Sequence, residues 1–401
     1  MSWTTPTDAL ALAEEIERQR PSLVGLLASL VRTETTNPPG DTRRAVDLIG
    51  ARLRRLGVDF QVLPEEPKKP NLLLRLGSGR PEVLLNSHLD TVPPGDRRAW
   101  RHDPLGAQIE GTRLYGRGAA DPKASVAAMV TAVETLVRRE APLAGSLLLS
   151  LVSDEEVGGA RGTEMLVERG LLRPDQVIVG EVTHNRIAIA EKGLLWVRLV
   201  TRGRTAHGST PWRGVNAIRS MVKVLTALEQ EIGARLAKES HALTPPPSLS
   251  VGTISGGIAT NVVPDRCEAT IDRRTLPHEH PAEALAEIDR VVARLREEDP
   301  DLDVTVESLQ QGPPIETPAD APLVLAAQEV AAALGLDPTP VGYQQASDGR
   351  FFAARGIATI LFGPGIPDLA HSADEYVDLD EVVTAAKFYA QVAVRLLGAH
   401  R

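Results

Sequence analysis

Short apolar runs alternate with longer amphipathic stretches along much of the chain. The clearest runs are EVLLN (82–86), SLLLSLV (146–152), QVIVG (176–180) and IATILFG (357–363). Each run is rich in Val, Ile or Leu, which indicates a β-strand. Patterns of helical period lie between most of these runs. Strands that alternate with helices predict an α/β domain with a mostly parallel, doubly wound sheet.

The middle of the chain follows a different order. Its pattern predicts, in turn, a strand (193–203), a helix (216–237), two strands (248–257 and 265–275), a helix (281–298) and a strand (302–309). The order β-α-β-β-α-β is typical of a ferredoxin-like sandwich. A chain of 401 residues is also too long for one typical core. We therefore assign residues 1–193 and 312–401 to a large domain, and 194–311 to a small domain inserted into it.

Composition and charge narrow the class of protein. Hydrophobic residues make up 42% of the chain and charged residues 24%, as in ordinary globular proteins. The net charge of −9 argues against nucleic acid or an anionic membrane as the main partner. No apolar run approaches the ~20 residues of a membrane span, and the N-terminal residues lack the pattern of a signal peptide. The single cysteine, Cys267, fits a reducing compartment, so we expect a cytoplasmic protein.

Acids and histidines follow each apolar run of the large domain. The runs lead, in chain order, to His88 and Asp90, to Asp154, Glu155 and Glu156, to Glu181, and to His371. Ligands of open α/β sheets bind beyond the carboxyl ends of the strands. His and carboxylate ligands without Cys suggest Zn²⁺ or a similar metal. The set exceeds what one tetrahedral ion needs, but two ions that share a bridging carboxylate would use it.

Asp121, in GRGAADPK, is the candidate for the bridging carboxylate. Followed by Pro122, it is equally well placed to cap the N-terminus of a helix. Spacing alone does not separate the two interpretations. The stretch GRGAAD also imitates a dinucleotide-binding fingerprint, but it does not follow a convincing strand and lacks the third glycine. We therefore discount a dinucleotide site.

Eight motifs together resemble those of a known family. They are HLDTVPPGD, YGRGAADPK, DEEVGG, GEVTH, TAHGSTPWRGVNAI, TNVVPDRCEATIDRR, SDGRFF and FGPG…AHSADE. Their order is that of the di-zinc aminoacylase and metallopeptidase family, which includes acetylornithine deacetylases, succinyl-diaminopimelate desuccinylases and related carboxypeptidases and dipeptidases. The resemblance covers nearly the whole chain, from TNPPG to the final helix. Each motif alone is weak, but jointly they are highly specific.

The resemblance implies two Zn²⁺ ions per subunit, for which Co²⁺ can substitute. The implied ligands are His88 and Glu181 for one ion, Glu156 and His371 for the other, and Asp121 for both. Asp90 would orient the ring of His88. Glu155 would be the general base that takes a proton from a metal-activated water. Asp154 is left as a solvated or structural acid.

The resemblance also gives a role to the inserted domain as a lid and dimerisation domain. It implies that His207, in TAHGSTP, stabilises the oxyanion in the active site of the partner subunit. That role requires a homodimer formed through the inserted domain. Without the resemblance, His207 would be taken for an ordinary loop histidine.

Substrate contacts are implied for four further residues. Arg274 and Asn261 would bind the α-carboxylate of the substrate, because an Arg fork suits a carboxylate. Gly363 and Gly365 would let the backbone approach the substrate. The alternatives are an ion pair of Arg274 with Asp272, and a simple Gly-Pro-Gly turn.

The chain departs from the family pattern just after Asp121. Many relatives have Met-Lys-Gly-Gly where this chain has Pro122-Lys123-Ala124-Ser125. The resemblance implies a cis peptide bond at this point, and a bond to proline adopts cis far more readily than other peptide bonds. We therefore predict a cis Asp121–Pro122 bond. Relatives also often have Pro in place of Val182, and these changes leave the substrate open.

Three functions compete at this stage. The first is hydrolysis of the amide bond of an N-acyl amino acid, as in a deacetylase or desuccinylase. The second is a metallo-exopeptidase that acts on dipeptides or on a C-terminal residue. The third is a non-catalytic homologue that binds a small ligand, but every metal position and the general base are present. The layout of HLDTVPPGD and of NVVPD favours the deacylase branch.

Overall fold

The structure is a computed structural model that describes residues 6–64 and 66–398. The chain forms two compact units. Unit 1 comprises Met1–Ile189, Thr317–Val341 and Ser347–Arg401, and unit 2 comprises Ala190–Glu316 and Gly342–Ala346. The predicted α/β class is confirmed, with a large sheet and a separate four-stranded sheet.

The large sheet has a parallel centre. It runs β1 (Phe60–Pro64), β2 (Pro70–Gly77), β6 (Ser146–Val152), β3 (Glu82–His88), β7 (Gln176–Val179), β15 (Ala358–Leu361), β8 (Ala188–Glu191) and β13 (Ile315–Glu316), and β14 (Val341–Tyr343) pairs with β8. Strands β6, β3, β7 and β15 are parallel to one another, whereas β2 and β8 join them antiparallel. The sheet is therefore mixed. Every residue of β6 is buried, as expected of a central strand covered on both faces.

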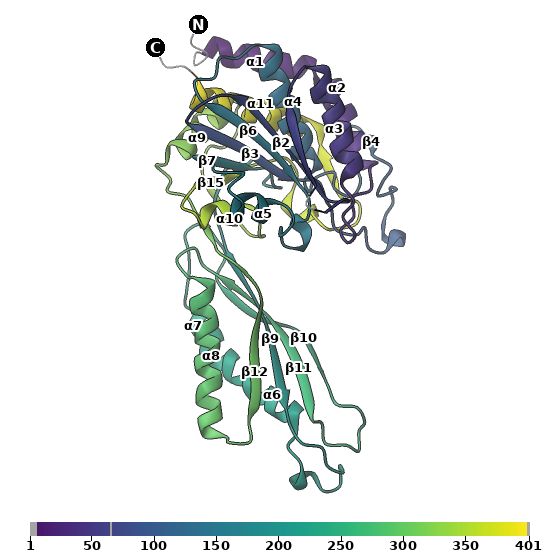
Figure 1. Ribbon diagram of the computed structural model, residues 1–401, viewed down its shortest axis with the longest axis vertical. Coiled ribbons are helices and arrows are strands. Elements are labelled where there is room, and N and C mark those ends of the chain that lie inside the picture. The colour runs from purple at the N-terminus through teal and green to yellow at the C-terminus, as the bar shows by residue number, and fades with distance from the viewer. Residues whose placement is uncertain (1–5, 65, 399–401) are drawn as a thin grey trace. The chain divides into compact units, whose positions relative to one another are not determined.

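Helices cover the large sheet. Unit 1 contains α1 (Pro6–Arg18), α2 (Arg20–Val31), α3 (Arg43–Arg55), α4 (Lys123–Arg138), α5 (Thr163–Glu168), α9 (Pro322–Ala333), α10 (Gly349–Ala353) and α11 (Leu379–Leu397). Helices α4 and α11 pack against each other and against β3, while α10 packs against α5, β7 and β15 (Figure 1). A small sheet of β16 (Tyr376–Asp378), β5 (Arg113–Tyr115) and β4 (Gln108–Glu110) completes the unit. Among the described residues, no helix is both long and apolar enough to cross a membrane.

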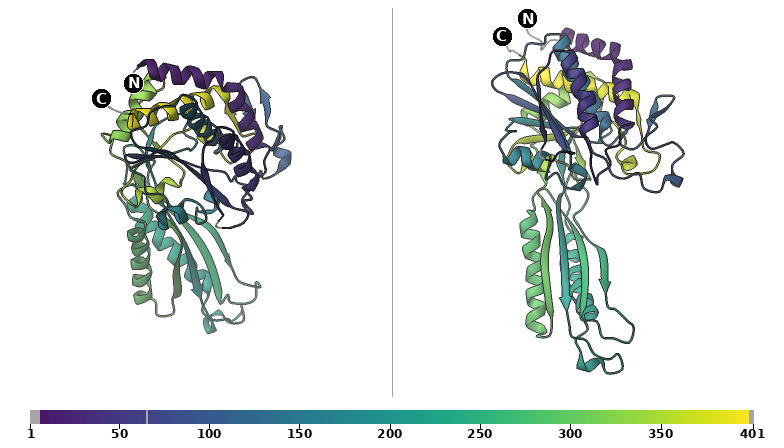
Figure 2. Two further views of the ribbon diagram at one scale, coloured as in Figure 1. Left: turned by 45° about the horizontal axis from the view of Figure 1, so that its top comes forward. Right: turned by 45° about the vertical axis from the view of Figure 1, so that its right-hand side comes forward.

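Unit 2 has the predicted β-α-β-β-α-β order. Its elements are β9 (Gly193–Arg202), α6 (Ala217–Leu228), α7 (Ala234–Leu236), β10 (Ser248–Gly256), β11 (Arg266–Thr275), α8 (Pro281–Glu298) and β12 (Asp303–Gly312). The strands are antiparallel in the order β10-β11-β9-β12. Figure 2 shows α6 and α8 beside this sheet. Alternate residues of β9, such as Val197 and Leu199, form one core with Met221 of α6 and Ile288 of α8.

The edge strand β10 of unit 2 is exposed along almost its whole length. Val251 and Ile254 on this strand are 44% and 54% exposed, although their neighbours on β11 are buried. The outer edge of β10 pairs with no other strand among the described residues. An unpaired edge of this kind is a ready template for pairing with another chain.

The parallel strands of unit 1 end where the acids and histidines begin. Strand β3 ends at His88 itself, β6 ends just before the turn Glu155–Val157, and β7 ends two residues before Glu181. Parallel neighbours deliver their carboxyl ends to the same edge of a sheet. The fold therefore gathers these side chains at one place.

Candidate metal centre

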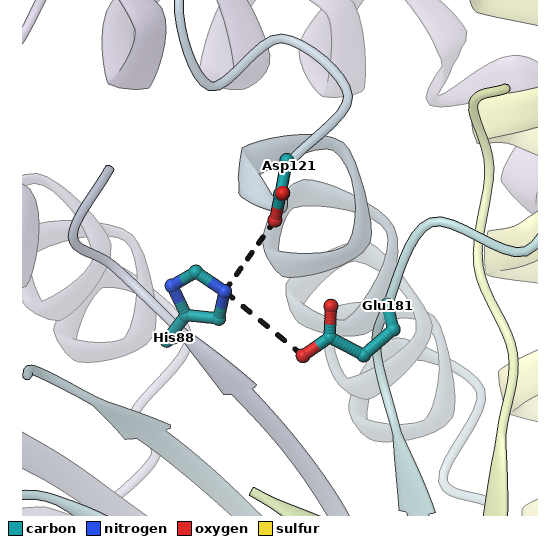
Figure 3. Close-up of side chains that lie close together, drawn as sticks. All are labelled: His88, Asp121 and Glu181. Carbon is teal, nitrogen blue, oxygen red and sulfur yellow. Dashed lines mark ion pairs between the residues drawn. The ribbon is translucent and has the colours of Figure 1, made fainter. Parts of the chain in front are cut away.

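A first group of possible metal ligands consists of His88, Asp121 and Glu181. His88 is the last residue of β3, and Asp121 lies just before α4. The three side chains point toward one another in Figure 3. The Nε2 atom of His88 lies 3.5 Å from Oδ1 of Asp121 and 4.0 Å from Oε1 of Glu181. One ligand atom from each lies within 4.8 Å of the others, so the group could hold one ion.

A second group consists of Asp121, Glu156 and His371. The Nε2 atom of His371 lies 3.2 Å from Oδ2 of Asp121 and 3.2 Å from Oε2 of Glu156. Asp121 thus turns Oδ1 toward His88 and Oδ2 toward His371. The structure brings together all five predicted ligands and places Asp121 where it could bridge two ions.

The carboxyl groups of this cluster lie in a poor environment for negative charge. Burial raises the pKa of Glu155, Glu156 and Glu181, because each carboxylate loses contact with water. Burial acts in the same direction on Asp121, but hydrogen bonds with His371 and His88 outweigh it and lower the pKa of Asp121. Four carboxyl groups around two imidazole rings leave a deficit of positive charge, which bound cations would correct.

The excess of carboxyl groups also affects the pKa of a histidine in the cluster. Hydrogen bonds with Asp121 and Glu156 raise the pKa of His371 to about 10. The donor atoms are imidazole nitrogens and carboxylate oxygens, without sulfur. Zn²⁺ accepts such a set, and a bridging carboxylate is common where two ions lie together. The described residues therefore fit a pair of divalent ions.

Glu155 belongs to neither group but lies beside them. Its Oε2 atom is 3.8 Å from Nε2 of His88. Asp90 holds the turn that carries it, because its carboxylate accepts hydrogen bonds from the backbone N–H of Glu155 (3.2 Å) and of Glu156 (3.3 Å). Asp90 also contacts Nδ1 of His88, at 3.0 Å through its carbonyl and 3.4 Å through its carboxylate. One aspartate thus orients both the imidazole ring and the glutamate turn.

Asp154 immediately precedes the same turn. It is 4% exposed and adopts a left-handed backbone with φ of 80°, so the interpretation as a solvated acid is wrong and the structural one holds. Its carboxylate pairs with Lys69 and accepts a hydrogen bond from the backbone of Arg161 at 3.2 Å. The amide of Asn37 joins this network to Asp90, at 2.8 Å.

The Gly363–Gly365 loop is pressed against the backbone of Glu181. A Cβ atom on Gly363 would lie 2.3 Å from the carbonyl oxygen of Glu181, and Gly365 has φ of +99°. The N–H of Gly365 donates to Glu381 at 2.8 Å. Glycine is therefore required here to seat the Glu181 loop. Contact of this loop with a substrate stays a prediction.

Unit 2 carries the remaining predicted residues. His207 and Asn261 lie on adjacent segments, because the N–H of Gly208 donates to the carbonyl of Asn261 at 2.7 Å. The exposed His207 ring contacts the hydroxyl of Ser209 at 2.7 Å. Arg274 forms the alternative ion pair with Asp272, with contacts of 2.8 and 3.2 Å. Its role in carboxylate binding stays a prediction.

Several supporting residues were not predicted. Asn37 and Lys69 carry no local signal, because their partners lie far along the chain. Arg117 and Glu375 lie within the motifs YGRGAADPK and AHSADE but received no role. The Asp121–Pro122 peptide bond is cis, as predicted.

Comparison with known proteins agrees with a centre for two metal ions. Residues 84–395 match the family model described as peptidase family M20/M25/M40. The succinyl-diaminopimelate desuccinylase of Alkalilimnicola ehrlichii is 33% identical over 362 residues, which cover 88% of this chain and 93% of that protein. A family M20 metallo-carboxypeptidase from Sulfolobus solfataricus has a TM-score of 0.76 at 20% identity, covering 94% of this chain and 98% of that one. A dinuclear metal-binding M20 peptidase from Bacillus subtilis has a TM-score of 0.72 at 16% identity, covering 95% and 99%.

Proposed function

Because the chain belongs to peptidase family M20/M25/M40, we propose that it is a di-zinc amidohydrolase that cleaves the amide bond of an N-acyl amino acid. The family resemblance seen in the motifs is confirmed, and with it a hydrolase that acts on amide bonds. The observation that supports two ions most directly is Asp121, whose two carboxylate oxygens face two different groups of ligands. Zinc is proposed as the native metal, with cobalt able to replace it.

The chemistry divides between the ions and the side chains. When bound, two divalent ions supply Lewis-acid activation of water and of the scissile carbonyl. Glu155, whose Oε2 atom lies 3.8 Å from Nε2 of His88, is proposed to take a proton from the attacking water and to pass it to the amine nitrogen as the C–N bond breaks. Asp90 keeps Glu155 in place through the backbone of the turn. The products are a carboxylic acid and a free amino acid.

The choice of an N-acyl amino acid rests on the curated relatives. Those above 30% identity include succinyl-diaminopimelate desuccinylases. Likeness to the carboxypeptidase, at 20% identity, bears on the fold alone. Arg274 and Asn261 are proposed to bind the α-carboxylate, and the Gly363–Gly365 loop to line the substrate. We also propose that the enzyme acts in the cytoplasm.

A substrate panel tests this function. Zn²⁺- and Co²⁺-loaded protein is offered N-acetyl, N-succinyl, N-formyl and N-carbamoyl amino acids, together with unmodified dipeptides. The proposal predicts turnover of one acyl class. Cleavage of the dipeptides alone would indicate an exopeptidase instead. A protein that binds no metal and turns over nothing would be a non-catalytic homologue.

We also propose that the chain forms a homodimer through the inserted segment 194–311. The same segment is proposed to act as a lid for the catalytic domain, which comprises segments 1–193 and 312–401. The unpaired edge of β10 supports it, together with the exposed apolar side chains Val251 and Ile254. Edge-to-edge pairing of two copies would form an isologous interface, the commonest kind in dimers. In such a dimer, His207 of one subunit is proposed to serve the active site of the other.

Mixing two inactive variants tests the dimer and the role of His207. His207→Ala and Glu155→Gln subunits are unfolded together and refolded at equal amounts. About one quarter of the wild-type activity is expected, because half of the random dimers are heterodimers with one complete site each. Each variant refolded alone is the control. If the mixture is as inactive as its components, His207 does not act across the dimer.

A further inference from the structure

A buried ion pair joins the two loops that carry Asp121 and His371. Its members are Arg117 and Glu375, which are 3% and 0% exposed. Neither residue belongs to the two ligand groups. Burying both charges is costly unless their hydrogen bonds are satisfied.

Glu375 fixes the backbone in front of α4. Its Oε1 atom accepts hydrogen bonds from the N–H of Ala120 (2.9 Å) and from the N–H of Asp121 itself (3.1 Å). Its other oxygen pairs with Arg117. The carbonyl of Glu375 also accepts from the N–H of Gly116 at 2.9 Å. A single carboxylate therefore anchors the residue that could bridge two ions.

Arg117 reaches the opposite loop. Its Nη2 atom donates to the carbonyl of Ser372, the residue after His371, at 3.1 Å. Its guanidinium lies 5.2 Å from the centre of the Trp100 ring, which fixes the plane of the fork. His371 has a left-handed backbone with φ of 64°. A non-glycine residue holds this conformation only when its surroundings enforce it.

We propose that the Arg117–Glu375 pair is the positioning element that sets Asp121 and His371 at the spacing required by the ion of the second group. This inference rests on the proposed two-ion function. The first group should depend on the pair less, because only its shared member Asp121 contacts Glu375, whereas two members of the second group, Asp121 and His371, lie on the loops that the pair joins. The other two members of the first group are held by the sheet, since His88 ends β3 and Glu181 follows β7.

The alternative is that the pair only stabilises the fold. The chain offers a matched control, since Arg52 and Glu134 form another bidentate pair, with contacts of 2.8 and 2.6 Å, in which Glu134 is buried and Arg52 is half-buried. Glu134 lies within α4 and its partner on α3. Neutralising the acidic member of either pair leaves a buried or half-buried arginine without its charged partner, which lowers stability in both cases. Only the Arg117–Glu375 pair contacts the loops that carry Asp121 and His371.

Calorimetric titration of metal-free protein with Zn²⁺ separates the two explanations. In Glu375→Gln the second ion is expected to bind about 10–100-fold more weakly, the usual effect of losing a residue that orients a ligand. The first ion should be weakened less than the second, because of its three ligands only Asp121 contacts Glu375. Arg117→Lys keeps the charge but loses the fork that joins Ser372 to Glu375, so a smaller loss at the second ion is expected.

The result expected of the control variant differs from every result that would contradict the inference. Glu134→Gln is expected to unfold at a lower temperature but to bind both ions like the wild type. The inference fails if Glu375→Gln binds both ions like the wild type, if it loses both equally, or if Glu134→Gln shows the same selective loss. A wild-type protein that binds fewer than two ions would overturn the proposed function as well.

Discussion

Replacement of Glu155 by Gln is expected to lower kcat by about 10²–10⁴-fold while leaving metal content unchanged. The amide of Gln has nearly the same shape as the carboxylate but cannot take a proton from water at neutral pH. Glu155 belongs to neither ligand group, yet its Oε2 atom lies 3.8 Å from Nε2 of His88. The change should therefore remove the base without removing a ligand.

This expectation is checked by steady-state kinetics on zinc-loaded protein, with metal content measured on the same sample. Glu168→Gln provides the matched control, because Glu168 is an exposed acid at the end of α5. It should keep wild-type turnover. If Glu155→Gln retains substantial activity with two ions bound, another group takes the proton and the assignment of Glu155 fails.

Replacement of Asp121 by Ala is expected to weaken both ions together. Asp121 is the only residue shared by the two groups of possible ligands found among the described residues. Loss of a residue that merely orients a ligand costs about 10–100-fold in affinity or activity, so loss of a shared ligand should exceed about 100-fold in turnover. Metal retained after dialysis, measured by mass spectrometry, should fall for both sites.

His371→Ala separates a shared ligand from an ordinary one. It removes a ligand from the second group alone, and His371 is 54% exposed, so the fold should tolerate the change. One ion should remain bound. If Asp121→Ala loses only one ion, as His371→Ala does, then Asp121 does not bridge and the two groups are independent.

The elements that could be predicted are those whose pattern is local. The apolar run of β6 and the amphipathic helix α8 have the predicted bounds. A continuous apolar run and an apolar helical face can both be recognised from residues close together in the sequence. The predicted helix 216–237 is instead interrupted by a π-type turn after α6. Strands β1 and β2 were not predicted; β1 pairs with its sequence neighbour β2 at the edge of the sheet, and β2 in turn pairs with the distant β6.

The same division applies to the site. Acids and histidines that end apolar strands could be predicted, because strand ends meet at one edge of the sheet. The direction of β2 and β8, and hence the mixed sheet, depends on tertiary pairing. The partners Lys69 and Asp154, or Arg117 and Glu375, lie far apart in the sequence, and nothing local joins them. Apart from Asp90, the residues that support the ligands were therefore the ones missed.

The central claim is that five side chains form one centre for two ions. Diffraction from zinc-loaded crystals at the zinc absorption edge tests it directly. The account predicts two anomalous peaks, one among His88, Asp121 and Glu181 and one among Asp121, Glu156 and His371, with Asp121 in contact with both. A single peak, or peaks away from these side chains, would contradict it.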